Sequence, residues 1–177
     1  HFQIQDLTFS YPTSKNKKSL DNVCLTIEKG EYIVLCGKSG SGKTTLMNML
    51  SGIYYPDEGQ IFIDGKEVTI SSPRDAFRYG IGMIHQHFKL VDVFTATENI
   101  ILGLEEKGRL DRAAAAERVR AICDAYGFQI DPNRKIYQMS VSQKQTVEIV
   151  KALYRGADIL ILDEPTAVLT PQETEKL

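Results

Sequence analysis

A glycine-rich segment with the spacing of a phosphate-binding loop, GKSGSGKTT, runs from Gly37 to Thr45. It follows an apolar run at residues 32–36 and precedes a helical pattern, LMNMLSG. Its glycines let the backbone curl so that successive N–H groups face one anion, and the positive end of the following helix adds to the attraction. Lys43 can then reach the β- and γ-phosphates of a nucleotide, and the Thr44 hydroxyl is placed to ligate Mg²⁺.

The alternative for this segment is a glycine-rich turn with an incidental lysine. The order of strand, loop and helix argues against that alternative, because a chance match rarely has this context. We therefore expect contacts to a nucleotide from the whole loop, namely Gly37, Lys38, Ser39, Gly40, Ser41, Gly42, Lys43, Thr44 and Thr45.

Two carboxylates close a second apolar pattern, ADILILDEP, at residues 157–165. Asp163 is expected to hold Mg²⁺ through water, and Glu164 to activate the attacking water. Successive side chains of a strand point to opposite sides, so one carboxylate can face a metal ion and the other a nucleophile. Taken alone, Glu164 could instead be a salt-bridge residue.

Strands are expected to position these residues. The alternating patterns at 2–11, 23–27 and 60–68 predict half-buried antiparallel strands, the last with an Asp-Gly turn. The continuous apolar run YIVLC at 32–36 predicts a strand covered on both faces, and residues 81–84 predict a further short strand.

Helical periodicity follows from about residue 95 to residue 155 and predicts an inserted helical region at about 92–157. The last helix is expected to run through residues 147–153. Three signals mark the helix ends. Thr95 and Glu98 form a capping-box pair, Asp111 is an N-cap, and Gly127 is a C-terminal stop.

Composition fits one compact domain, since the 177 residues are 42% hydrophobic and 25% charged. The net charge of −2 argues against a nucleic-acid partner, because such proteins carry a basic excess. Three scattered cysteines, Cys24, Cys36 and Cys123, have neither metal-site nor disulfide spacing and favour a reducing, cytoplasmic compartment. No apolar run is long enough to span a bilayer, so if the protein works at a membrane, other chains or segments must hold it there.

The order of the motifs resembles that of the nucleotide-binding domain of ATP-binding cassette (ABC) proteins. About 120 residues separate Lys43 from Asp163, which is long for a simple nucleotide kinase or GTPase. The resemblance covers FSYP, the phosphate loop, the glutamine of GMIHQHF, the signature in MSVSQKQTVEI and the strand that ends in DEP. It implies an α/β fold: a P-loop NTPase core with a parallel sheet, an N-terminal antiparallel β subdomain and an inserted helical subdomain. It also implies ATP and Mg²⁺ as ligands.

The resemblance assigns roles to residues outside the loop. Tyr11 would stack on adenine; its alternative is a core tyrosine of an edge strand. Gln86 would contact Mg²⁺ and the attacking water; its alternative is a polar loop residue. The signature residues Ser140, Ser142 and Gln143 would contact a nucleotide held by a facing cassette. The neighbouring His85 and His87 are interpreted as structural or surface residues.

Two longer stretches, IHQHFKLVDVFTATENI and ALYRGADILILDEPTAVLTPQE, look like the ATPase subunits of bacterial importers of simple sugars and nucleosides. Those subunits carry two cassettes in one chain, and EPTAVLTPQE resembles the first. The resemblance implies a second cassette and integral membrane permease subunits as partners. It also implies a peripheral location at the cytoplasmic face of the bacterial cell membrane.

The signature departs from the family pattern, because Ser142 stands where a glycine is usual. A Cβ there obstructs close backbone approach, so we expect this signature to dock but to support hydrolysis at the partner's site poorly. Ser142 and Gln145 have capping-box spacing, which predicts a well-formed helix start at Ser142. Two alternatives stay open, namely a catalytically weakened regulatory cassette and a non-transport ABC ATPase.

The chain has no initiator Met and stops in the polar stretch PQETEKL, which suggests a fragment. The histidine that the family carries beyond a further strand is then missing. The fragment alone would also lack a facing signature. We expect it to hydrolyse ATP poorly by itself.

Overall fold

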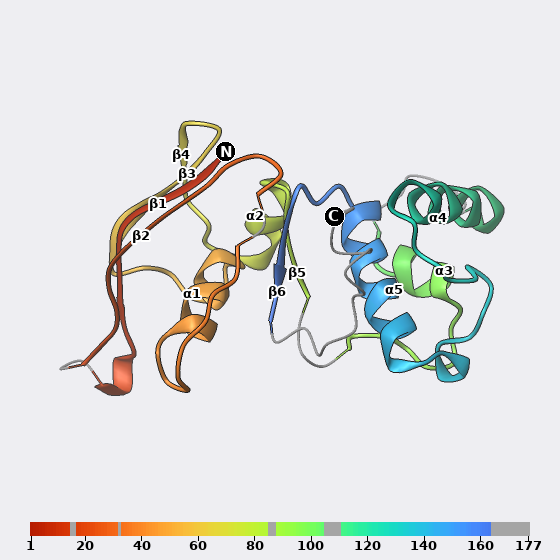
Figure 1. The fold of residues 1–177 in the computed structure, drawn as a ribbon, viewed down its shortest axis with the longest axis horizontal. Helices are drawn as coiled ribbons and strands as arrows, with labels where there is room; N and C mark the ends of the chain where they lie inside the picture. The colour runs from red at the N-terminus through yellow and green to blue at the C-terminus, as the bar shows by residue number, and fades with distance from the viewer. Residues whose placement is uncertain (15–16, 32, 85–87, 105–110, 164–177) are drawn as a thin grey trace. The chain divides into compact units, whose positions relative to one another are not determined.

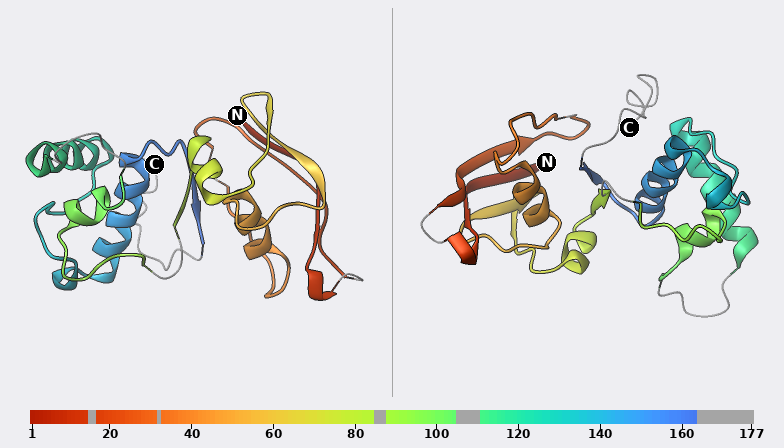
Figure 2. Two further views of the ribbon diagram at one scale, coloured as in Figure 1. Left: turned by 180° about the vertical axis from the view of Figure 1, so that it is seen from behind. Right: turned by 90° about the horizontal axis from the view of Figure 1, so that it is seen from below.

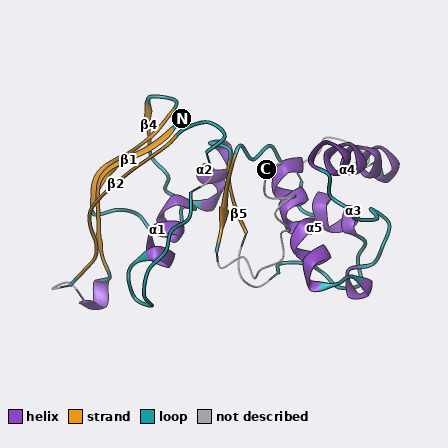
Figure 3. Ribbon diagram, in the orientation of Figure 1, coloured by secondary structure: helices purple, strands orange, loops and turns teal. Residues whose placement is uncertain are grey.

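The computed structural model describes residues 1–177 except 15–16, 32, 85–87, 105–110 and 164–177, and it forms two compact units (Figure 1). Unit 1 is His1–Ile81 and unit 2 is Gly82–Leu177. Strands make up most of the regular structure of unit 1, and helices most of that of unit 2 (Figure 3).

Unit 1 is built on a four-stranded antiparallel sheet in the order β2-β1-β3-β4. This arrangement confirms the antiparallel strands predicted at the start of the chain. A short 3-10 turn, Pro12–Ser14, follows β1. The strands are β1 (Phe2–Ser10), β2 (Lys18–Ile27), β3 (Glu58–Ile63) and β4 (Lys66–Val68).

An irregularity in β1 explains why its apolar residues change phase. Ile4 and Leu7 are three positions apart, which in a regular strand would turn them to opposite faces. The pairing of β1 with β2 shifts register between these residues, and Asp6 has a φ of 50°. Such a bulge absorbs the extra residue. Both side chains are consequently buried, at 1% and 0% exposure.

The turn between β3 and β4 has the backbone that its sequence predicts. Asp64 and Gly65 both have positive φ, 49° and 73°, between the paired residues Ile63 and Lys66. Two consecutive left-handed residues match the twist of an antiparallel hairpin, and Asp-Gly adopts them readily. The predicted Asp-Gly turn is confirmed.

Two helices complete unit 1 and lie beside the sheet, α1 (Lys43–Leu50) and α2 (Pro73–Arg78) (Figure 2). The buried face of α1 consists of Thr45, Leu46, Met49 and Leu50. Helix α2 begins with Ser72 as its N-cap, whose hydroxyl accepts from the Asp75 N–H, and with a proline in its first turn. Proline suits this position because its missing N–H would have no partner in the helix.

Gly42 allows α1 to begin directly against β2. Its φ is 91°, and a Cβ added there would lie 2.7 Å from the Ser19 carbonyl oxygen and 2.8 Å from Leu20 Cδ2. Only glycine fits, because both the left-handed backbone and the close approach exclude a side chain.

The buried strand predicted at residues 32–36 is wrong for its described part. Residues 33–36 form no strand, and the Val34 side chain is 63% exposed. An apolar run becomes a central strand only where neighbouring strands supply hydrogen bonds and cover its faces. None of the described strands pairs with residues 33–36, so the apolar pattern alone did not suffice.

Unit 2 combines a two-stranded parallel sheet with a group of helices. The strand predicted at 81–84 is confirmed as β5, which runs from the end of unit 1 into unit 2, and the strand predicted around 157–165 is confirmed as β6. The connection between them contains the helices, as expected for an inserted region. The elements are β5 (Ile81–Ile84), α3 (Ala96–Ile101), α4 (Arg112–Tyr126), a 3-10 turn (Ile136–Gln138), α5 (Val141–Tyr154) and β6 (Ile159–Leu162).

The predicted helix signals of unit 2 are confirmed. Thr95 and Glu98 form a reciprocal capping box at the start of α3. Asp111 caps α4, which ends at Gly127 with a φ of 72°. The hydrogen bond from the Thr95 N–H is the main reason why the pKa of Glu98 is lowered, and Lys135 and Arg112 add to it.

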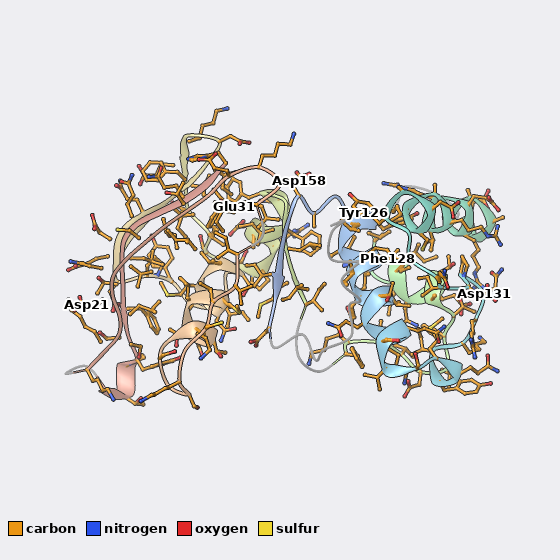
Figure 4. All side chains as sticks on the ribbon, in the orientation of Figure 1. Asp21, Glu31, Tyr126, Phe128, Asp131 and Asp158 are labelled. Atoms are coloured by element: carbon orange, nitrogen blue, oxygen red, sulfur yellow. The ribbon has the colours of Figure 1, made fainter. Side chains whose placement is uncertain are left out.

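The centre of unit 2 is helix α5, which packs against α3 and α4. Its residues Val147, Ile149 and Val150 are fully buried, and shortening such an isoleucine to alanine typically costs about 2–5 kcal/mol. Tyr126 and Phe128 stack at the end of α4, with ring centroids 6.0 Å apart (Figure 4).

In the part of the chain that the structure describes, no helix is both long and apolar enough to span a bilayer.

We predict that Cys123 on α4 resists alkylation, whereas Cys24 and Cys36 react. Burial raises the pKa of the Cys123 thiol to about 11, and the side chain is 4% exposed, while the other two cysteines are exposed. The reactive species is the thiolate, and at pH 8 about one Cys123 thiol in a thousand is ionised. Site-resolved labelling measured by mass spectrometry should show Cys123 modified only after unfolding. Equal labelling rates at the three cysteines contradict this prediction.

We also predict that Gly42→Ala lowers the melting temperature more than Gly40→Ala. Both glycines have positive φ, 91° and 79°, which costs a side chain about 1–2 kcal/mol. Gly40 is the matched control, because an added Cβ there meets nothing within 4 Å, whereas at Gly42 it meets β2. Thermal unfolding without nucleotide measures the difference. Equal melting temperatures would show that the contact with β2 does not matter.

Candidate nucleotide-binding site

The predicted phosphate loop forms a tight bend before α1. Gly40 and Gly42 have left-handed backbone conformations, and the Ser41 N–H donates to the Lys38 carbonyl at 3.2 Å. The Leu46 N–H donates to the Gly42 carbonyl at 2.9 Å, which is the first bond of the helix. The predicted loop followed by a helix is thus confirmed, with Gly42 as the N-cap.

The Lys43 ammonium group lies within this bend. It donates to the carbonyl oxygens of Gly37 at 2.7 Å and Lys38 at 3.1 Å, and to Ser41 Oγ at 3.3 Å. These bonds hold a positive charge at the place where the glycine spacing predicts an anion. An ammonium group has three donors, and each has an acceptor within the bend, so a phosphate oxygen would replace one of these bonds.

The start of α1 differs from the starts of the other described helices. Helices α2, α3, α4 and α5 each begin with a side chain that accepts a backbone N–H, from Ser72, Thr95, Asp111 and Ser140. Helix α1 has no side-chain cap, and its first turn contains no acidic residue. The first N–H groups of a helix need partners, and an anion supplies them. The start of α1 therefore fits a phosphate group.

Tyr11, predicted to stack on adenine, lies next to the helix that follows the loop. Its hydroxyl is 2.9 Å from Thr45 Oγ1, and Thr45 is buried in the first turn of α1. Its ring also contacts Phe9 and Tyr54. The side chain is half-buried, so stacking on adenine stays a prediction. The sequence patterns did not predict that Tyr54 contacts Tyr11, because nothing in GIYYPD distinguishes Tyr54 from Tyr55.

The predicted Mg²⁺ ligands belong to different parts of the structure. Thr44 is exposed in the first turn of α1 in unit 1. Asp163 follows β6 in unit 2, where its N–H donates to the Ile84 carbonyl at 3.1 Å. Gln86 and Glu164, predicted to act in hydrolysis, lie outside the described residues, as do His85 and His87.

The signature residues form the start of α5. The Gln143 N–H donates to Ser140 Oγ at 3.3 Å, and Gln143 Oε1 accepts the Ser140 N–H at 3.1 Å. Ser142 adds a hydroxyl contact to Ser140, with 3.0 Å between the two Oγ atoms. The signature serines and Gln143 are thus joined in one hydrogen-bonded group.

The capping box predicted at Ser142 and Gln145 is wrong. The N-cap of helix α5 is Ser140, two residues earlier than that spacing implies, and its box joins Ser140 and Gln143. Ser142 therefore lies inside the first turn, where its carbonyl accepts the Thr146 hydroxyl at 3.0 Å. Gln145 is 4% exposed and so belongs to the buried face of the helix.

Helix α5 also holds residues 89–92, which lie between β5 and α3. Glu148 Oε1 accepts the Lys89 N–H at 2.6 Å, and Lys151 Nζ donates to the Lys89 carbonyl at 3.3 Å. Lys144 forms an ion pair with Asp92 at 3.2 Å. Burial lowers the pKa of Lys151, which fits its position between the helix and this segment. Helix α5 and residues 89–92 are therefore joined by hydrogen bonds and an ion pair.

Comparisons with known proteins agree with this arrangement. The family model described as ABC transporter matches residues 20–167. The guanosine import ATP-binding protein NupO of Bacillus subtilis (strain 168) is 55% identical over 159 residues, which are 89% of this chain and 31% of the relative. The ribose import ATP-binding protein RbsA of Clostridium perfringens (strain SM101 / Type A) is 44% identical, over 90% of this chain and 33% of the relative. The chain thus spans about a third of the length of the curated relatives it matches.

Solved structures give the same result. The ATP-binding cassette MJ0796, solved as a dimer in a post-hydrolysis state with ADP and Pi, is 28% identical with a TM-score of 0.74, covering 99% of this chain and 79% of that one. The ADP conformation of the cassette MJ1267 has a TM-score of 0.80 at 24% identity, over 99% of this chain and 72% of that one, which supports the fold alone. An α/β P-loop cassette fold, a loop that fits phosphate and a family model that matches most of the chain lead to one conclusion: the chain belongs to the ABC transporter family.

Proposed function

We propose that this chain is one ATP-binding and ATP-hydrolysing cassette of an importer that takes up a sugar or a nucleoside through a membrane permease. The observation that carries the proposal is the open start of α1, with Lys43 held in the bend before it, in a chain of the ABC transporter family. The names of the relatives support import of a small solute, since they are guanosine and ribose import ATP-binding proteins.

In this proposal the loop Gly37–Thr45 binds the phosphates of ATP through its N–H groups and Lys43. Thr44, Gln86 and Asp163 would hold Mg²⁺, which when bound neutralises phosphate charge. Glu164 would accept a proton from the attacking water. Tyr11 would hold the adenine ring by stacking.

The proposed partners are a second cassette and permease subunits, with the chain at the cytoplasmic face of the bacterial membrane. We further propose that residues 1–177 form a single cassette with its helical subdomain at about 92–157. The segment 88–93 is the proposed permease contact. In this segment Val91 and Val93 are 37% and 64% exposed. Helix α5 contacts the same segment through Lys89 and Asp92. Apolar side chains exposed on a supported segment suit a protein contact.

A second candidate is a cassette whose signature supports hydrolysis weakly, so that the chain acts mainly in regulation. The contact between Ser142 and Ser140 favours it. Ser140 already accepts the Gln143 N–H and pairs with the Ser142 hydroxyl, so its oxygen is engaged within its own helix start. A phosphate from a facing cassette would have to compete with these bonds.

We predict that Lys43→Ala lowers ATP hydrolysis by the full-length protein about a hundredfold, as loss of a strong charged donor typically does. Solute uptake into membrane vesicles that contain the permease should fall in parallel. Lys29→Ala, at an exposed lysine in the turn after β2, is the matched control and should retain activity. Hydrolysis and uptake that both persist in Lys43→Ala would contradict the proposed function.

We predict that Ser142→Gly raises ATP turnover of the full-length protein severalfold. Glycine removes both the hydroxyl contact to Ser140 and the Cβ that obstructs close approach. Ser142→Ala separates these effects, because alanine removes only the hydroxyl. Phosphate release under saturating ATP is the measurement. No gain in Ser142→Gly would count against a weakened signature.

A further inference from the structure

The ring of Tyr11 is fixed by two other aromatic rings in unit 1. Phe9 and Tyr54 are nearly parallel, with an interplanar angle of 20° and centroids 5.4 Å apart. Tyr11 is nearly perpendicular to both, at 81° and 87°, with centroid distances of 5.2 and 5.6 Å. Edge-to-face geometry of this kind is favourable because the positive ring edge meets the negative ring face. Tilting Tyr11 would therefore disturb two contacts.

A hydroxyl contact holds the far end of the same ring. Tyr11 OH and Thr45 Oγ1 are 2.9 Å apart, and Thr45 is 6% exposed. A threonine in a helix has few χ1 rotamers, so its hydroxyl is a firm anchor. Thr45 is thus more than a loop residue that follows Thr44, since it joins α1 to the ring expected to meet adenine.

Two of the three residues that hold Tyr11, Thr45 and Tyr54, come from α1 or the turn that follows it, and the third, Phe9, lies in β1. Thr45 lies in the first turn of α1, and the Tyr54 N–H donates to the Asn48 carbonyl of the same helix at 3.2 Å. The helix that starts at the phosphate loop therefore also sets the orientation of the Tyr11 ring.

We propose that Thr45 and Tyr54 are positioning residues that hold the Tyr11 ring ready for the base of the nucleotide. The proposal rests on the proposed function, because it assumes that ATP binds at this loop. A ring already fixed in its binding orientation loses less conformational freedom when the base arrives. The contribution of Thr45 and Tyr54 is to base recognition, in addition to any contact with phosphate.

The test compares binding of ATP with binding of inorganic tripolyphosphate, which has the phosphates but no base, by the full-length protein. Tyr54→Leu should weaken ATP binding about three- to tenfold, the range expected for losing an aromatic pair, and leave tripolyphosphate binding unchanged. Tyr54→Phe keeps the ring and should bind ATP normally. Tyr55→Leu is the matched control, since Tyr55 is the adjacent tyrosine and is 60% exposed.

A double-mutant cycle tests the hydroxyl contact separately from phosphate contacts. Thr45→Val should lower the ratio of ATP affinity to tripolyphosphate affinity. Thr45→Ser keeps a hydroxyl and should keep the ratio of the unaltered protein. In a Tyr11→Phe background the same Thr45→Val change should leave that ratio unaltered, because the partner hydroxyl is already gone. This cycle stays informative if Tyr54→Leu fails to fold.

The outcomes separate the two proposals. If the unaltered protein binds neither ATP nor tripolyphosphate, the proposed function fails. If it binds both, and Tyr54→Leu and Thr45→Val change the two affinities equally or not at all, the positioning role is overturned. Selective loss of ATP affinity, with rescue by Tyr54→Phe and Thr45→Ser, supports it.

Discussion

The close approach of Gly42 to β2 is the constraint on which the phosphate loop depends. A hydrogen in place of a side chain makes this approach possible, because a Cβ at Gly42 would lie 2.7 Å from the Ser19 carbonyl oxygen. Helix α1 can then begin at Lys43 without a residue that could cap it. Because the helix start is unblocked, its positive end of about half an elementary charge stays available to an anion.

The starts of helices α1 and α5, both assigned to nucleotide binding in the proposed function, differ in how they are capped. The start of α1 has no side chain that accepts its N–H groups. At the start of α5, the Ser140 side chain accepts the Gln143 N–H and the Gln143 side chain accepts the Ser140 N–H. A closed start is stable by itself, since a cap is worth about 0.5–2 kcal/mol, but it has less to offer a ligand. The Ser142 hydroxyl adds to the closure. In the proposed function, the backbone N–H groups at the start of α1 would therefore bind phosphate without losing a side-chain cap, whereas the signature would have to give up internal bonds.

Local signals in the sequence predicted most of the secondary structure. The Asp-Gly turn at 64–65 and the caps at Thr95 and Asp111 follow from the chemistry of a few adjacent residues, so each could be predicted correctly. The strand at 32–36 could not, because an apolar run reports only that it can be covered, and its pairing depends on distant segments. The wrong box at Ser142 had another cause. Ser140 and Ser142 both have an amide residue three positions later, and burial of Gln145 decides between them.

The aromatic contacts around Tyr11 could not be predicted from sequence patterns, for a related reason. Phe9, Tyr11 and Tyr54 come from β1, the residue after it and the turn after α1, and only the fold brings them together. Helix α1 therefore has two roles. It presents N–H groups at its start, and its Thr45 hydroxyl contacts the hydroxyl of Tyr11. A displacement of α1 would therefore change both the position of the N–H groups at its start and the contact with the Tyr11 hydroxyl. In the proposed function, a helix that presents the N–H groups and contacts the ring would keep the distance between them constant, which recognition of a phosphate and a base in one molecule requires.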